Sequence, residues 1–221
     1  DVEAAFDAAN WANATKIELS YENFIVNSNG TSIFELNMGE QGIDTVEPRA
    51  EGMLYLMWDE GGLYFAAEMT DGSIHLFQPY GGQGNIQDGI QFCVNTTGNL
   101  ETQDLNNGYI FDFAPVSGED KSGPASWFEH FQHKGNNPNI DLKMSGALTD
   151  TGYVMQGYIP WEAFKEGGEE FTAQAGFVFG FGILVIDFNA DAQLNDLYFD
   201  YGGGQNTIGD PSTWNRIELV A

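Results

Sequence analysis

The stretch LYLMWDEGGLYFAAEMTD, from Leu54 to Asp71, consists of two apolar, aromatic runs on either side of an acidic tip that contains two glycines. Short apolar runs bounded by Gly and Asp are typical of strands, and Gly61 and Gly62 permit the positive φ angles of a tight turn. The stretch therefore predicts an antiparallel hairpin whose second strand ends at Asp71. We assign Asp59, in the tip, a role in the turn only.

Similar strand signals recur on both sides of this hairpin, with aromatic and β-branched residues between Gly, Asn and Asp. They predict further strands over Lys16–Tyr21, Ile90–Val94, Tyr109–Phe113, Trp127–Gln132, Leu142–Leu148, Tyr153–Ile159, Gly176–Asp187, Leu197–Tyr201 and Arg216–Val220. A single short helix is predicted over Pro160–Phe164, because proline suits the first helical turn.

About ten strands with almost no helix predict an all-β fold, in which two antiparallel sheets pack into a β-sandwich of the jelly-roll or immunoglobulin-like kind. A closed barrel is the alternative. All-β folds of this length commonly form one unit, so we expect a single domain over residues 1–221.

The charge of the chain limits its partners, since it has 33 acidic and only 7 basic residues and a net charge of −26. Such a surface repels nucleic acid and anionic membranes, and both are excluded as partners. The longest apolar run, from Gly176 to Ile186, falls short of the ~20 residues of a membrane span and is predicted to be a buried strand. Cys93 is the only cysteine, which rules out an internal disulfide.

Several segments follow one another along the chain in an order that is typical of one protein family. They are AANWANATKIELSY (8–21), the hairpin from Leu54 to Asp71, QDGIQFCVN (87–95), DTGYVMQGYIPWEAF (150–164), GFVFGFGILVIDFNAD (176–191) and DPSTWNRIELV (210–220). In this combination the chain resembles the family 9 carbohydrate-binding modules and their DOMON-like relatives. The resemblance implies a β-sandwich with structural calcium and a sugar site. It further implies a non-catalytic, extracellular module that binds a polysaccharide or oligosaccharide beside or tethered to a glycoside hydrolase.

The sugar site that the resemblance implies departs from the family pattern at three positions. Family 9 modules hold a sugar end between two tryptophans, and the corresponding positions here are Asn85 and Ile208. A glutamate of the family corresponds to Gln91, whose amide still hydrogen-bonds hydroxyl groups. We therefore expect an atypical site that includes Asn85 and Gln91 but lacks the two stacking rings.

Other residues are candidates to replace the missing rings. Tyr80 lies among glycines, close in sequence to Asn85 and Gln91, and is a candidate stacking ring; its alternative role is to pack within a loop. Trp127 and His130 lie in a segment longer than the family pattern leads us to expect, where Trp127 would stack on a sugar and His130 would hydrogen-bond it. The alternative is that Trp127 belongs to the core.

Candidate calcium ligands follow two of the predicted strands. Asp187, Asn189 and Asp191 alternate at the end of the long strand, a spacing that lets a turn direct several hard oxygens at one calcium ion. Asp71, at the end of the hairpin, is a further candidate ligand. The alternatives are a solvated acidic loop for the first group and a turn-forming aspartate for Asp71.

No catalytic residue is assigned, because neither a Gly-x-Ser-x-Gly elbow nor a phosphate-binding glycine loop is present in the sequence. Two other function classes stay open beside the sugar-binding module. One is a polysaccharide-active enzyme on the same scaffold, which would need two facing carboxylates. The other is a structural or adhesive surface domain without a small ligand.

Overall fold

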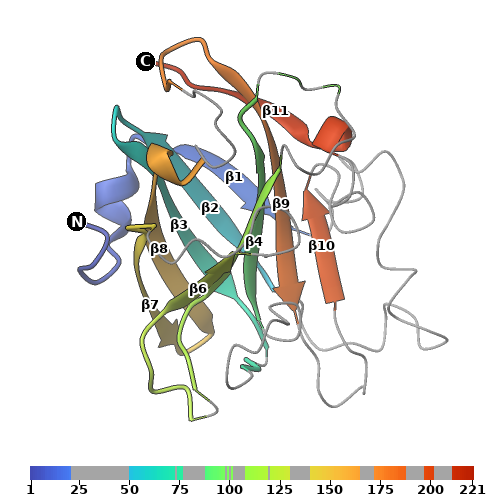
Figure 1. Ribbon diagram of the computed structural model, residues 1–221. Coiled ribbons are helices and arrows are strands. Elements are labelled where there is room, and N and C mark those ends of the chain that lie inside the picture. Colours follow the sequence, from blue (N-terminus) through green and yellow to red (C-terminus); the bar gives the residue numbers. More distant parts are fainter. Residues whose placement is uncertain are drawn as a thin grey trace, which may run out of the picture.

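The computed structural model describes residues 1–20, 50–72, 74–76, 88–97, 99, 101, 108–118, 120–129, 140–164, 172–187, 197–201 and 211–221. Two antiparallel sheets pack face to face (Figure 1). The strands are β1 (Thr15–Leu19), β2 (Glu51–Trp58), β3 (Gly62–Thr70), β4 (Gly89–Asn95), β5 (Tyr109–Ala114), β6 (Ser126–Glu129), β7 (Lys143–Thr149), β8 (Gly152–Pro160), β9 (Val178–Asp187), β10 (Leu197–Tyr201) and β11 (Asn215–Glu218). Three short 3-10 helices are η1 (Ala8–Trp11), η6 (Trp161–Phe164) and η8 (Pro211–Thr213).

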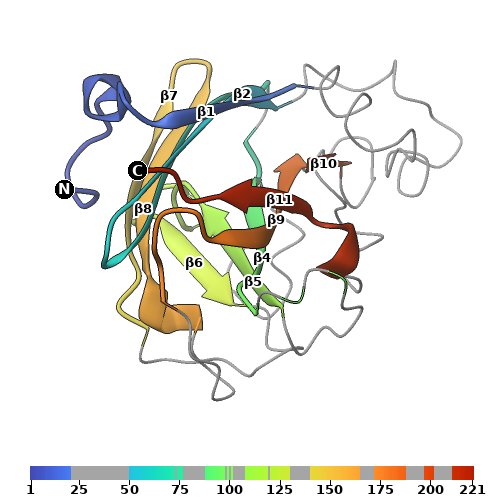
Figure 2. The ribbon, with the colours of Figure 1, turned by 90° about the horizontal axis from the view of Figure 1, so that it is seen from above.

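The first sheet, called sheet A, has the strand order β1-β2-β3-β8-β7. The second, called sheet B, has the order β10-β9-β4-β5-β6, and β11 pairs with the first part of β9. Seen from above in Figure 2, the N-terminal segment with η1 lies on the side of sheet A that faces away from sheet B. The predicted all-β sandwich is confirmed, and the predicted hairpins are β2–β3 and β7–β8.

One detail of the sequence prediction is wrong. Pro160 does not open a helix but ends β8, where it pairs with Gly62, and η6 begins at Trp161. The Trp161 indole Nε1 donates a hydrogen bond of 2.8 Å to the Asp59 carbonyl, and this bond attaches η6 to the β2–β3 turn. Among the described residues, no helix has the length and apolar character needed to cross a membrane.

A cluster of phenylalanines from both sheets forms the centre of the core. Because side chains alternate along a strand, Phe65 of β3 and Phe92, Phe113 and Phe181 of sheet B all point between the sheets. The ring of Phe65 lies 5.1 Å from that of Phe92 and 4.5 Å from that of Phe113, measured between centroids. Phe92 in turn contacts Phe181 at 5.1 Å. Aromatic packing therefore holds the two sheets together.

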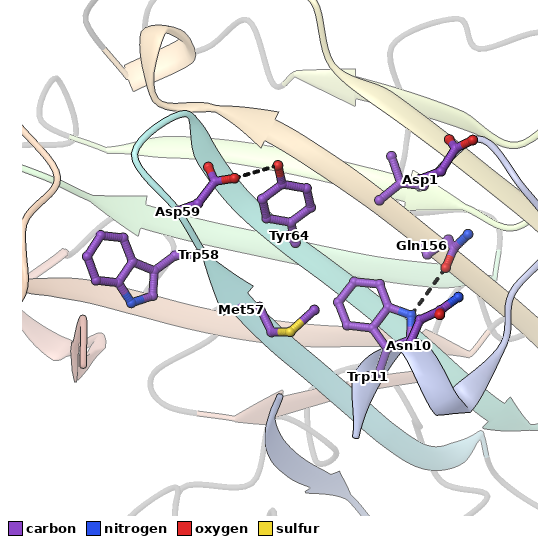
Figure 3. A pocket seen from close by; sticks show the side chains of 9 residues that line it. Asp1, Asn10, Trp11, Met57, Trp58, Asp59, Tyr64 and Gln156 are labelled. Carbon is purple, nitrogen blue, oxygen red and sulfur yellow. Dashed lines mark hydrogen bonds between the residues drawn. The ribbon is translucent and has the colours of Figure 1, made fainter. Parts of the chain in front are cut away.

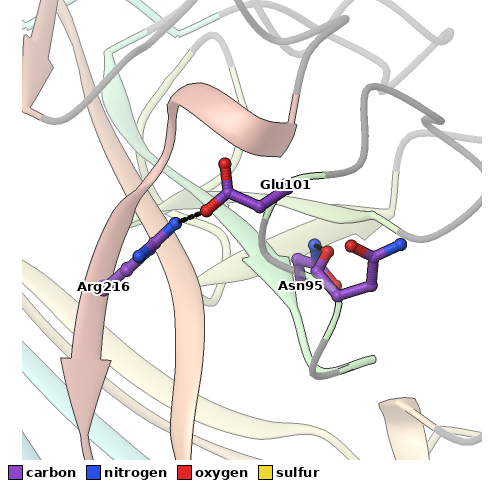
Figure 4. Close-up of polar contacts among 4 residues, drawn as sticks. Asn95, Glu101 and Arg216 are labelled. Atoms are coloured by element: carbon purple, nitrogen blue, oxygen red, sulfur yellow. Dashed lines mark hydrogen bonds and ion pairs between the residues drawn. The ribbon is translucent and has the colours of Figure 1, made fainter.

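Sheet B is buried on both faces over its central strands, since every residue of β4 and β5 is buried. Polar contacts at the edge of sheet B add little to its stability. Arg216 of β11 forms an ion pair with Glu101, which lies beyond the end of β4 (Figure 4), but both side chains are half or more exposed. Exposed ion pairs of this kind contribute at most about 1 kcal/mol to stability.

Asp59 has the role predicted for it in the turn between β2 and β3. Its Oδ1 accepts hydrogen bonds from the backbone N–H groups of Gly61 and Gly62, at 2.7 and 3.1 Å, and its Oδ2 accepts one of 2.8 Å from the Tyr64 hydroxyl. An aspartate that bonds to the backbone two and three residues later stabilises a turn. Burial, followed by the hydrogen bond to Asp59 and its negative charge, raises the pKa of Tyr64 to about 12.

This pKa shift predicts a loss of stability at alkaline pH. Since the folded-state pKa lies above the ordinary tyrosine value of 10.0, the neutral phenol of Tyr64 stabilises the fold fully below pH 10, and that contribution disappears as the pH rises to about 12. We expect Tyr64→Phe to lose less stability than the wild type across this window. Urea unfolding at several pH values measures it, and parallel losses in the two proteins would contradict the assignment.

Candidate functional site

Three buried aspartates from different parts of the chain meet at one end of the sandwich. Asp71 follows β3, Asp88 precedes β4 and Asp187 ends β9, and one carboxylate oxygen of each lies within 4.8 Å of the others. Their exposed fractions are 8%, 0% and 4%. In Figure 1 this end of the sandwich is the lower one, where β9 terminates. Because β3 belongs to sheet A and the other two strands to sheet B, the cluster joins the two sheets.

Backbone pairing explains why these three residues meet. Gly89 pairs with Ile186 across β4 and β9, which places the preceding Asp88 beside the following Asp187. A side chain at Gly89 would collide with the Phe113 carbonyl, 2.1 Å from its Cβ position, so glycine is required for this approach. In sheet A, the backbone N–H of Asp71 donates a 2.9 Å hydrogen bond to the Thr151 carbonyl in the β7–β8 turn.

Further backbone contacts orient two of the carboxylates. Asp187 Oδ2 accepts a 2.8 Å hydrogen bond from the backbone N–H of Ala50, which precedes β2. Asp88 Oδ2 accepts one from the backbone N–H of His75, and the Asp88 N–H donates to the His75 carbonyl at 2.8 Å. Residues that follow β3 and precede β2 are thereby attached to the aspartate cluster, whose geometry depends on the fold rather than on a single loop.

Tyr153 of β8 is the fourth polar side chain in this region and is completely buried. Burial, followed by the negative charges of Asp71, Asp88 and Asp187, raises the pKa of its phenol well above the ordinary value. Within the described part of the chain, its hydroxyl has no hydrogen-bond partner. The Tyr153 hydroxyl therefore lies in the same buried polar region as the three carboxylates.

The donor set of this cluster fits a hard divalent cation. Three ionised carboxylates at this separation repel one another, and burial removes the water that would reduce the repulsion. Calcium takes oxygen ligands at about 2.3–2.6 Å, so two oxygens on one ion lie at most about 5 Å apart, which the 4.8 Å spread satisfies. The cluster contains neither His nor Cys, the residue types that zinc sites favour.

The sequence predicted two of these three residues. Asp71 and Asp187, which the sequence analysis named as separate candidate ligands, lie in one cluster, whereas Asn189 and Asp191 lie outside the described residues. Asp88 was missed as a candidate ligand. Its position directly before the glycine that opens a buried strand was visible, but its proximity to Asp187 follows only from the pairing of β4 with β9.

The predicted sugar residues are only partly described. Gln91 points away from the core on the outer face of sheet B, and its Nε2 donates a 2.5 Å hydrogen bond to Oδ1 of Asp112 on β5. Both side chains are buried. Asp112 was not predicted; its signal was its place as a charged residue within the apolar run of β5. The positions of Tyr80, Asn85, His130 and Ile208 lie outside the described residues.

Trp127 does not lie where the predicted stacking role would need it. It pairs with Phe113 in the β5–β6 register, so it shares the core-facing side of sheet B, and its ring lies 6.4 Å from that of Phe111. It is half-buried against the core. Gln91 faces the opposite side of the sheet, so the structure does not bring Trp127 and Gln91 together. The structure agrees with the alternative interpretation of Trp127 as a core residue.

Comparison with solved structures finds the same fold in other proteins. A family 9 carbohydrate-binding module from Caldicellulosiruptor kristjanssonii in complex with cellotriose aligns with a TM-score of 0.66 at 13% identity, over 100% of this chain and 89% of that one. One from the same organism in complex with glucose gives 0.57 at 15% identity, over 79% of each chain. A protein from Bacteroides uniformis, provisionally described as carbohydrate-binding, gives 0.60 at 9% identity, over 95% and 88%.

No family model and no curated protein matches the chain. At these identities the structural likeness shows the fold, which is that of the family 9 carbohydrate-binding modules. The fold implied by the sequence resemblance is thereby confirmed.

Proposed function

We propose that this chain is a carbohydrate-binding module that recognises a polysaccharide or oligosaccharide without cleaving it. The observation that carries the proposal is the likeness of the fold to family 9 modules in complex with cellotriose, over 100% of this chain, and with glucose, over 79% of it. Fold alone does not establish function, so the proposal also needs a site with suitable polar groups.

Gln91 and Asp112 are the described residues that suit the floor of such a site. They form a hydrogen-bonded pair on the outer face of sheet B, and both are buried. In a sugar site, a few placed amide and carboxylate groups orient hydroxyls while an aromatic ring provides contact area. We propose Gln91 as the orienting amide. Tyr80, Asn85 and His130 remain proposed contacts from segments outside the described residues.

We further propose that calcium stabilises the fold at the aspartate cluster. Asp71, Asp88 and Asp187 would hold the ion, with Asn189 and Asp191 as additional proposed ligands. Bound calcium would supply the positive charge that offsets the mutual repulsion of these buried carboxylates. An extracellular location is part of the same proposal, in keeping with the resemblance to family 9 modules.

Affinity electrophoresis against a panel of polysaccharides tests the binding function. Each gel is run with calcium and with a chelator, and each band is assayed for released sugar. Retardation without sugar release supports the proposal, and loss of retardation in chelator shows that the glycan site depends on calcium. Sugar release would identify an enzyme instead. Absence of both on every glycan would favour a structural or adhesive domain.

A substitution at Gln91 tests the site itself. Gln91→Met keeps the side-chain length but removes both hydrogen-bonding groups, and we expect at least about tenfold weaker retention on the best glycan, because an unmatched sugar hydroxyl loses a hydrogen bond. Gln174→Met, at an exposed glutamine, is the matched control and is expected to bind as the wild type does. Thermal unfolding verifies that Gln91→Met is folded. Unchanged retention in a folded Gln91→Met would exclude Gln91 from the site.

A further inference from the structure

A pocket of about 240 Å³ lies on the outer face of sheet A, on the opposite side of the sandwich from Gln91. Figure 3 shows the side chains that surround it. Trp11 comes from η1, Met57 and Trp58 from β2, Asp59 from the β2–β3 turn, Tyr64 from β3 and Gln156 from β8. Asp1 also lines the pocket, which therefore combines aromatic rings with two carboxylates, and none of its residues belongs to the aspartate cluster.

The wall formed by the N-terminal segment is held in place by hydrogen bonds. Gln156 Oε1 accepts a bond of 3.2 Å from the Trp11 indole, and Gln156 Nε2 donates one of 3.0 Å to the Ala4 carbonyl. Ser145 Oγ contacts the carbonyl oxygens of Val2 and Ala4 at 2.7 and 2.8 Å. Trp11 also packs against Tyr55, with centroids 6.4 Å apart. These contacts make the pocket a formed cavity before any ligand binds.

The aromatic donors of the pocket are already used within the protein. The indole of Trp11 donates to Gln156, that of Trp58 donates to the Val220 carbonyl at 2.8 Å, and the Tyr64 hydroxyl donates to Asp59. The pocket thus offers a ligand ring faces and acceptor oxygens, and the amide of Asn10 is the remaining side-chain donor on its lining. Lys and Arg are absent from the lining residues. The lining therefore favours a cation over an anion, and a neutral polyol finds few donors.

The carboxylates of Asp1 and Asp59 give the pocket its negative charge, and Asp59 is the one beside the Tyr64 ring. Its side chain is exposed at the turn, and Oδ2 accepts one hydrogen bond, from Tyr64. A carboxylate has about four acceptor positions in total, so Oδ2 has capacity for a further donor. Cations bind favourably to the faces of Trp and Tyr rings and to carboxylates.

We propose that this pocket binds a small organic ammonium ion. Its ammonium group donates to Asp59 Oδ2, and its apolar body lies against the ring of Tyr64 and the thioether of Met57. The net charge of −26 also raises the local concentration of cations at the surface. This site is separate from the proposed glycan site on sheet B.

Calorimetric titration with glucosamine, at a pH where its amine is protonated, tests the proposal. N-acetylglucosamine is the neutral control, since it keeps the sugar ring but has no charge. We expect glucosamine to bind at least about tenfold more tightly than this control, and added salt to weaken its binding. Equal affinity for both compounds, or no heat from glucosamine up to high millimolar concentration, would overturn the proposal.

Variants locate the binding. Asp59→Asn keeps the acceptor for the N–H groups of Gly61 and Gly62 but removes the charge, and we expect at least about tenfold loss of glucosamine affinity. Asp150→Asn, at an exposed position in the β7–β8 turn, changes the net charge equally and should bind as the wild type does. Equal losses in both variants, or none in a folded Asp59→Asn, would overturn the proposal. Glycan retention is also measured for Asp59→Asn. This measurement distinguishes a failure of the proposed ammonium site from a failure of the proposed glycan site.

Discussion

Calcium is expected to raise the melting temperature of the wild-type protein strongly, and Asp187→Asn is expected to abolish that rise. An ion present at about 100 times its dissociation constant stabilises the folded state by about 2.7 kcal/mol. In a domain of this size that corresponds to a rise in Tm of about 5–11 °C. Thermal unfolding with calcium and with chelator measures the difference, and isothermal titration measures the affinity.

The behaviour without calcium distinguishes a metal site from an ordinary buried carboxylate. In chelator, Asp187→Asn removes one of three mutually repelling charges, although it also alters the bond that Ala50 donates to this side chain. We expect Asp88→Asn to lose the calcium response as well, while Asp150→Asn retains it in full. A wild-type protein whose Tm is the same in calcium and in chelator would contradict the calcium proposal, and so would an Asp187→Asn variant that keeps the response.

Phe65→Ala is expected to cause the largest loss of stability among single substitutions in the core. Phe65 is 1% exposed and lies between the rings of Phe92 and Phe113, so its removal leaves a cavity between the two sheets. Substitutions of a buried Phe by Ala typically cost about 3–5 kcal/mol of the free energy of unfolding. Small proteins have only about 5–15 kcal/mol in total, so the variant is expected to be marginally stable.

Urea unfolding at equilibrium measures this loss. Leu148→Ala is the control, because Leu148 lies on the edge strand β7 with 37% of its surface exposed. We expect the control to change stability by at most about 0.5 kcal/mol. A loss below about 1 kcal/mol in Phe65→Ala would mean that the two sheets are not held together by the aromatic cluster.

The calcium response and the loss of stability in Phe65→Ala both depend on contacts between the two sheets. Such contacts were less predictable from the sequence than the strands themselves. The strands were predictable because each is a local pattern of aromatic and apolar residues bounded by Gly, Asn or Asp. The β2–β3 hairpin and the role of Asp59 in its turn follow from adjacent residues and were correct. Pro160 was misplaced because a proline at the start of a helical turn and one at the end of a strand have the same sequence context.

The candidate sites were harder to predict, because they combine residues far apart in the chain. Asp88 joins Asp187 through the β4–β9 register, over a separation that no local pattern reports. Trp127 faces the core because its partner Phe113 does, which is also a matter of register. The pocket on sheet A needs η1 to lie across β2, β3 and β8, and the hydrogen bond from Trp11 to Gln156 spans 145 residues.

The sequence by itself determined that this protein is built from antiparallel strands with an aromatic core, and that Asp71 and Asp187 stand at strand ends. Local propensities and side-chain alternation are sufficient for those conclusions, since they act between neighbours in the chain. Tertiary structure alone decided which acidic residues share one buried cluster, which tryptophan enters the core and where a pocket opens. Those outcomes depend on pairing and packing between distant segments, because a shift of one residue in register turns each side chain to the other face of its sheet.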